Sequence, residues 1–127
     1  MKEIKMPSLL QIHHAQITIP KGSENEARAF YCDLLGLTEI EKPESLKGRG
    51  GFWLQVGDRQ VHVGTEDFDD RHKTKAHVAY LVNDLDEWRQ KLENLGISII
   101  DGIPIPHYQR FEFRDPFGNR VEFLEGL

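Results

Sequence analysis

An internal repeat limits the fold of this chain more than any other feature of its sequence. Leu35-Gly36-Leu37 and Leu95-Gly96-Ile97 each close a segment with helical apolar periodicity, and each glycine stands where a left-handed C-terminal cap belongs. The interval from Gly36 to His62 equals the interval from Gly96 to Glu122. The two halves of the chain are therefore expected to repeat one order of elements.

Each half is predicted to form a strand, a helix and three more strands, which makes an α+β chain of two βαβββ modules. Module one covers about residues 12–65 and module two about residues 76–125, and a charged linker at about 66–75 joins them within a single domain of 127 residues. The expected strands lie at 12–19, 37–40, 52–56 and 60–63, and again at 76–82, 97–100, 110–114 and 120–124. Two capping boxes, Ser23 with Glu26 and Asp84 with Glu87, predict where the helices start.

The composition is typical of a small soluble protein with one core. Hydrophobic residues make up 39% and charged residues 29% of the chain, and the formal charge is −5, without a basic run that would suit nucleic acid or an anionic membrane. The apolar stretches are too short to cross a bilayer, and the start of the chain lacks the apolar core of a signal peptide. Cys32 is the single cysteine, so no internal disulfide forms and we expect a cytoplasmic protein.

Four side chains with metal-binding chemistry fall at equivalent positions of the two halves. His14 and His77 lie in the first strands, whereas His62 and Glu122 lie in the last strands. Two curved sheets related by a pseudo-two-fold axis would bring these strands together, so that the four side chains face one cleft. Three imidazoles and one carboxylate suit Zn, Fe, Ni, Co or Mn, and His14, His77 and Glu122 alone make the two-histidine, one-carboxylate set of non-haem iron sites.

The alternative for each histidine is an ordinary packed or exposed side chain, since the chain has six histidines. The equivalence of four positions favours a metal site over coincidence. His13 is expected to point to the opposite strand face, towards packing or a dimer surface. His72 and His107 are expected in solvent-facing loops.

Further residues are candidates for contact with a substrate. Gln16 and Thr18 share the strand face of His14. Trp53 could stack on a ligand, although it suits a core or a dimer interface equally well. Arg110 and Arg120 could bind an anionic group, although a solvated surface arginine explains either one equally well. The sequence has no phosphate-binding glycine loop, zinc-type cysteine pair or nucleophilic serine motif.

Four segments resemble the vicinal oxygen chelate superfamily, also called the glyoxalase, bleomycin-resistance and extradiol-dioxygenase group. They are HHAQITIP, AFYCDLLGL, AHVAYLVNDLDEW and FEFRDPFGNRVEFLE, and together they extend from about Ile12 to Glu125. The resemblance implies paired βαβββ modules whose curved mixed sheets form a cleft around one divalent metal, usually in a homodimer. It also transfers the role of metal ligand to His14, His62, His77 and Glu122.

The resemblance implies an enzyme whose metal chelates two adjacent oxygens of a small substrate and stabilises an oxyanion or enolate. Dioxygenase, isomerase or lyase, and thiol-transferase reactions all occur on this scaffold. Glyoxalase I has a glutamate where His62 stands here, so Glu122 alone remains as a carboxylate base, with His62 as a fourth ligand or a base. This difference argues against lactoylglutathione lyase activity. The alternative within the same family is a metal-free protein that binds or sequesters an antibiotic, as bleomycin-resistance proteins do.

Overall fold

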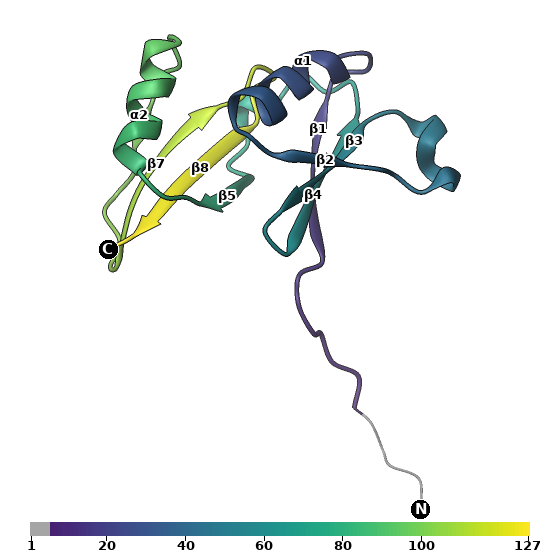
Figure 1. Cartoon of the computed structure of the whole chain (residues 1–127), viewed down its shortest axis with the longest axis horizontal. Coiled ribbons are helices and arrows are strands. Elements are labelled where there is room, and N and C mark those ends of the chain that lie inside the picture. Colours follow the sequence, from purple (N-terminus) through teal and green to yellow (C-terminus); the bar gives the residue numbers. More distant parts are fainter. Residues whose placement is uncertain (1–5) are drawn as a thin grey trace, which may run out of the picture.

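The computed structural model describes residues 6–127, which form two four-stranded sheets, one from each half of the chain (Figure 1). The first sheet has the order β1-β4-β3-β2 and contains β1 (His14–Ile19), β2 (Thr38–Ile40), β3 (Phe52–Val56) and β4 (Arg59–Thr65). The second has the order β5-β8-β7-β6 and contains β5 (His77–Leu81), β6 (Ile100–Asp101), β7 (Tyr108–Arg114) and β8 (Arg120–Gly126). In both sheets the first strand pairs in parallel with the last. The predicted fold of two βαβββ modules is confirmed.

The helices follow the first strand of each half. In the first half, α1 (Glu24–Arg28) continues as the π-helical segment η1 (Ala29–Leu34), and α2 (Leu85–Asn94) is its counterpart in the second half. Gly36 and Gly96 have φ angles of 81° and 78°, in the left-handed region that the predicted C-terminal caps require. Two short 3₁₀ segments, η2 (Glu44–Arg49) and η3 (Arg71–Lys73), lie in connections where no helix was predicted.

Ser23 and Asp84 are the N-caps of the two helices, so the predicted helix starts are confirmed, but the side-chain bonds of both predicted capping boxes are absent. Ser23 makes no side-chain hydrogen bond to its helix, because its hydroxyl donates to the carbonyl of Pro20 at 2.5 Å. Asp84 has a φ angle of 51° and its side chain makes no cap bond either. The carboxylate of Glu125 instead accepts from the backbone N–H groups of Asp84 and Leu85, at 3.0 and 3.1 Å. A strand distant in sequence thus caps α2, since β8 ends beside the start of that helix.

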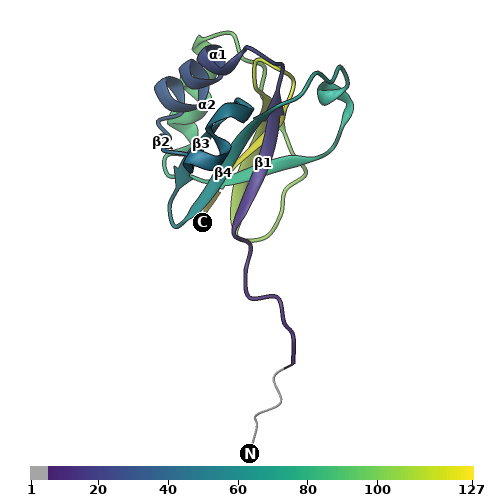
Figure 2. The same ribbon diagram turned by 90° about the vertical axis from the view of Figure 1, so that its right-hand side faces the viewer.

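All eight strands overlap their predicted ranges, and most ends agree within two residues. β1 begins at His14 and not at residue 12, and β6 (Ile100–Asp101) overlaps the strand predicted at 97–100 only at Ile100. Figure 2 shows both helices on one side of the sheets and the segment before β1 extending away from the body of the protein. No helix among residues 6–127 is long and apolar enough to cross a membrane.

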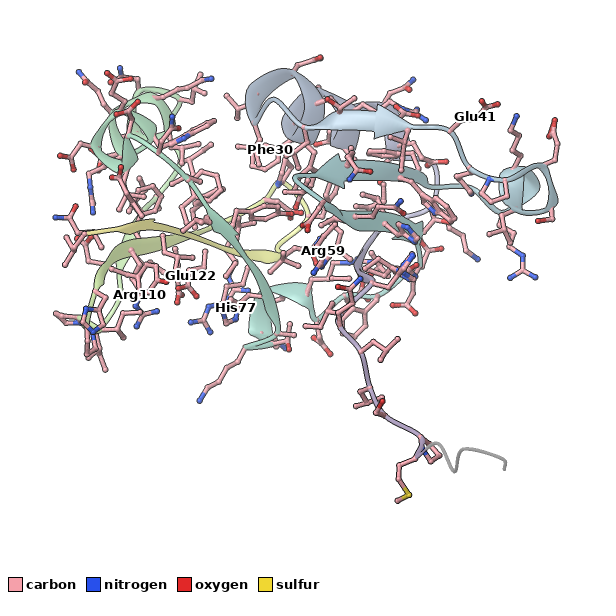
Figure 3. The ribbon with its side chains drawn as sticks, turned by 60° about the horizontal axis from the view of Figure 1, so that its bottom comes forward. Phe30, Glu41, Arg59, His77, Arg110 and Glu122 are labelled. Carbon is pink, nitrogen blue, oxygen red and sulfur yellow. The ribbon has the colours of Figure 1, made fainter. Side chains whose placement is uncertain are left out.

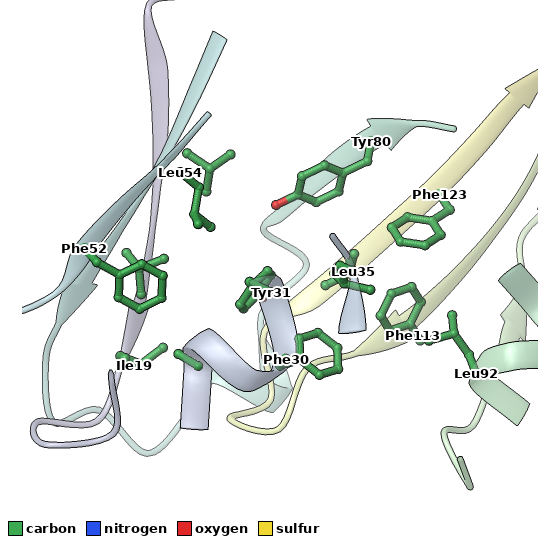
Figure 4. Packing of buried hydrophobic residues seen from close by; sticks show 14 of the residues in the cluster. Ile19, Phe30, Tyr31, Leu35, Phe52, Leu54, Tyr80, Leu92, Phe113 and Phe123 are labelled. Carbon is green, nitrogen blue, oxygen red and sulfur yellow. The ribbon is translucent and has the colours of Figure 1, made fainter. Parts of the chain in front are cut away.

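One hydrophobic core joins the two halves (Figure 4). Alternation along β4 directs Val61 and Val63 into this core and His62 to the opposite face of the sheet. Residues of η1 lie between the sheets, where the ring of Phe30 lies 6.4 Å from that of Phe113 in β7. The core therefore covers one face of each sheet and leaves the other face to polar side chains.

The turn between β7 and β8 ties the second sheet to the first. Asp115 is 5% exposed and accepts hydrogen bonds from the backbone N–H of Phe117, from Asn119 and from the hydroxyl of Tyr31 in η1. The Asn119 amide also donates to the carbonyl of Thr18 in β1, at 2.9 Å. The DPFGN sequence that carried the family resemblance is therefore a structural junction between the modules.

The connection between the modules is held by a buried arginine. Arg71 is 4% exposed and donates to the backbone carbonyls of Thr18, Phe68 and Glu66. Its own carbonyl accepts a hydrogen bond from Arg114 of β7. The charged linker predicted at about 66–75 thus has one buried side chain, which anchors it to β1.

Candidate metal centre

The polar face of the first sheet carries His14, His62 and Trp53 as a stack of three rings. His62 lies directly opposite Trp53 in the β3–β4 pairing, and the two rings stack at 3.8 Å with an interplanar angle of 4°. His14 of β1 covers the other side of His62, at 3.9 Å and 17°. As a result His62 is only 5% exposed, whereas His14 is exposed.

Burial controls the protonation of His62. Desolvation, followed by the positive charges of His14, His13 and Lys42, lowers the pKa of His62 from 6.5 to about 4. Its Nε2 lies 2.9 Å from the side-chain oxygen of Gln60. At neutral pH this imidazole is therefore uncharged, which is the form that binds a metal.

The polar face of the second sheet places His77 against Glu122 (Figure 3). His77 Nε2 lies 2.9 Å from Glu122 Oε1, and His77 Nδ1 lies 2.9 Å from the carbonyl oxygen of Lys75. A carbonyl only accepts, so Nδ1 is the donor of the contact with Lys75, and Nε2 is left to face the carboxylate. Either a proton on Nε2 or a metal ion joins this nitrogen to Oε1 of Glu122. Metal-binding histidines commonly donate their other N–H to a backbone carbonyl in this way.

A network of charges surrounds Glu122. Glu112 lies directly opposite it in the β7–β8 pairing, and both are buried. Arg120 donates to both carboxylate oxygens of Glu112, and these hydrogen bonds lower the pKa of Glu112. Arg110 Nη1 lies 3.6 Å from Glu112 and 3.5 Å from Glu122. The alternation in RFEFR places Glu112 on the face of Glu122, yet this residue was not among those predicted for the site.

The structure brings the four predicted ligands together as two pairs. The strand registers confirm that His14 and His77 are equivalent, since they pair with Gln60 and Arg120 in the two sheets. His14 and His77 also line one groove of about 640 Å³ between the sheets. Within residues 6–127, however, no three His, Cys, Asp or Glu side chains lie close enough to hold one ion. The assignment of the four ligands to a single metal therefore stays a prediction.

The predicted substrate contacts have different surroundings. Gln16 and Trp53 line a pocket of about 570 Å³ beside His14 and His62. The hydroxyl of Thr18 accepts a hydrogen bond from Arg71 and lies 3.5 Å from Glu66, so its contacts are with residues of the linker. His13 was expected on the opposite face, but its Nδ1 lies 2.9 Å from that of His14, because His13 precedes the first strand residue and escapes the strand alternation.

Comparison with known proteins identifies the family. The model of the Glyoxalase/Bleomycin resistance protein/Dioxygenase superfamily matches residues 11–123, which is most of the chain. The chain belongs to this superfamily. No curated protein matches it.

Solved structures of the glyoxalase superfamily share the fold. A glyoxalase family protein from Bacillus anthracis is 43% identical, with a TM-score of 0.86 over 97% of this chain and 100% of that one. The fosfomycin resistance protein FosX from Listeria monocytogenes, in complex with Mn(II) and sulfate, is 14% identical, with a TM-score of 0.75 over 94% of this chain and 93% of that one. A lactoylglutathione lyase from Agrobacterium tumefaciens is 22% identical, with a TM-score of 0.68 over 94% of this chain and 96% of that one. At these lower identities the likeness concerns the fold alone.

Proposed function

We propose that the protein is a divalent-metal-dependent enzyme that acts on a small molecule through two adjacent oxygens, with the metal held by His14, His77 and Glu122. One observation carries the proposal. Nδ1 of His77 faces a backbone carbonyl and Nε2 faces the carboxylate of Glu122, so a metal ion can bind Nε2 and Oε1 in place of a proton between them. The superfamily supports the proposal, since the FosX structure contains Mn(II).

His62 is the fourth ligand in this proposal, in preference to a general base. A base works best when its pKa lies near the working pH, and the pKa of His62 is about 4. Its ring is also held in place by Trp53 on one side and His14 on the other. Glu122 is then the residue that takes up and returns a proton at the substrate.

A complete set of ligands requires two copies of the chain. Each sheet contributes two ligands on its polar face, and within one chain the two pairs do not form a cluster among residues 6–127. In a homodimer, the His14–His62 pair of one copy would meet the His77–Glu122 pair of the other. Three nitrogen ligands and one oxygen ligand would then surround one ion, which suits Zn, Fe, Ni, Co or Mn.

The bound ion would supply Lewis-acid chemistry, polarising the two substrate oxygens and stabilising an oxyanion or enolate. Trp53 and Gln16 line the adjoining pocket and would position the rest of the substrate. An iron-loaded protein would favour dioxygenase chemistry. Zinc, nickel, cobalt or manganese would favour isomerase, lyase or thiol-transferase chemistry.

Metal analysis tests the proposal directly. Tag-free protein, purified anaerobically without chelator and reconstituted with each ion in turn, is analysed by plasma mass spectrometry. We expect one ion per chain in the wild type and a loss of stoichiometric binding in His77→Ala. His72→Ala, which removes an exposed histidine from the linker, should bind metal like the wild type. A wild type that stays free of metal would contradict the proposal and favour a metal-free protein that binds or sequesters its ligand.

Mixing of variants tests the contribution of two copies. One double variant lacks His14 and His62, the other lacks His77 and Glu122, and neither should bind metal alone. After the two are unfolded and refolded together, mixed dimers should each regain one complete site, or about one ion per four chains. If the four ligands act within one chain, the refolded mixture will bind no metal.

A further inference from the structure

Three arginines alternate with two glutamates on the polar face of the second sheet. They differ in how completely other groups use their N–H donors. Arg120 donates from two nitrogens to the two carboxylate oxygens of Glu112. Arg114 donates from Nη1 to the carbonyls of Arg71, Thr74 and Gly118. Both therefore hold protein groups together.

Arg110 is anchored on one side only. Its Nε and Nη2 donate to the carbonyl of Ile103, at 3.2 and 2.8 Å. Its guanidinium lies over Gly102, where a Cβ atom would come within 2.9 Å of Arg110 Cζ and would displace the guanidinium. The anchored edge fixes the direction of the opposite edge, and Nη1 lies towards Glu122 (Figure 3).

Arg110 Nη1 lacks a short partner. Its contacts with Glu112 and Glu122 are 3.6 and 3.5 Å long, beyond the usual range of a strong ionic hydrogen bond. Both carboxylate oxygens of Glu112 already accept hydrogen bonds from Arg120, which hold Glu112 at this distance from Arg110. The side chain of Arg110 is 19% exposed, so solvent and small molecules reach it.

This face carries more positive than negative charge. Three arginines, Arg110, Arg114 and Arg120, stand beside two glutamates, Glu112 and Glu122. A divalent cation bound by Glu122 would add to the positive charge beside Arg110, which a neutral substrate would not compensate. An anionic substrate would offset this charge and would accept a hydrogen bond from the weakly bound Nη1 of Arg110.

We propose that Arg110 binds an anionic oxygen of the substrate. The substrate is therefore a carboxylate or phosphonate-type anion with two adjacent oxygens. Glu112 holds Arg120, so that Arg120 does not bind the same anion. This inference rests on the proposed metal-dependent function and adds the charge of the substrate. It does not depend on whether one or two copies build the metal site, since Arg110 and Glu122 belong to one sheet.

A matched pair of probes tests the inference. Mn²⁺-loaded protein is titrated with glycolate, an anion with two adjacent oxygens, and with glycolamide, its neutral counterpart, and binding is followed by water proton relaxation. We expect the wild type to prefer glycolate by roughly tenfold or more, the size of one charge-assisted hydrogen bond. Arg110→Gln should lower this preference about tenfold, leaving only the preference of the metal for an anionic oxygen, and should keep its manganese. Arg89→Gln removes an equal charge from α2, near Phe111 on the core side of the sheet, and should keep the preference.

Two results would overturn the inference. One is an Arg110→Gln variant whose preference for glycolate equals that of the wild type. The other is a variant that loses manganese together with glycolate, which would mean that Arg110 supports Glu122 as a metal ligand. A wild type that takes up no manganese would instead contradict the proposed function. Glycolate binding would then be measured by NMR on metal-free protein. If Arg110→Gln loses glycolate binding and Arg89→Gln keeps it, the anion site is supported. If Arg110→Gln still binds glycolate, the anion site is rejected.

Discussion

The buried imidazole of His62 should make the stability of the metal-free protein depend on pH. In the unfolded chain this histidine binds a proton as the pH falls through about 6.5, but in the folded protein its pKa is about 4 because of burial and neighbouring positive charge. The unfolded state therefore binds more protons between these two values, and stability falls as the pH is lowered through this window. A change from pH 8 to pH 4.5 should cost about 2.5 kcal/mol through His62 alone.

Urea denaturation followed by circular dichroism, with a chelator present, measures this effect. His62→Gln is the control, since glutamine is polar and of similar length but does not titrate. Other groups, including Glu112 with its lowered pKa, contribute equally to both proteins, so the difference between the two pH profiles isolates His62. We expect the wild type to lose about 2.5 kcal/mol more than the variant over this range. Parallel profiles would refute the assignment of a neutral, desolvated imidazole.

Three further predictions concern the fold that supports the site. Gly51→Ala should destabilise the protein by about 3 kcal/mol or more in urea, because its φ is 76° and a Cβ atom would strike a backbone carbonyl of β4. Gly57→Ala, also at positive φ but with no atom nearby, should cost only about 1 kcal/mol. Tyr31→Phe should lower the free energy of unfolding by about 1–2 kcal/mol, since Asp115 loses a buried donor. Arg71→Met should cost about 3 kcal/mol by leaving backbone carbonyls without donors, and limited proteolysis should then cut the segment between the sheets faster.

Local sequence was sufficient to predict the repeat of elements and the residues at which the helices end. The period of two in the strands, the apolar stripe of the helices and the glycines at their ends depend on neighbouring residues, so they were readable without the structure. The equivalence of His62 and Glu122 was also readable, because an equal interval from Gly36 and Gly96 places them at equivalent strand positions.

Only the tertiary structure decided which side chains meet. Glu125 caps α2 in place of the predicted Asp84 and Glu87 because the end of β8 lies there. The alternation in RFEFR fixes the sheet face of Glu112, but only the register of β7 with β8 sets it opposite Glu122. The separation of the four predicted ligands into two pairs likewise depends on how the two sheets are placed. Such contacts join residues far apart in the chain, and their energies depend on distance in space, which no local pattern of residues records.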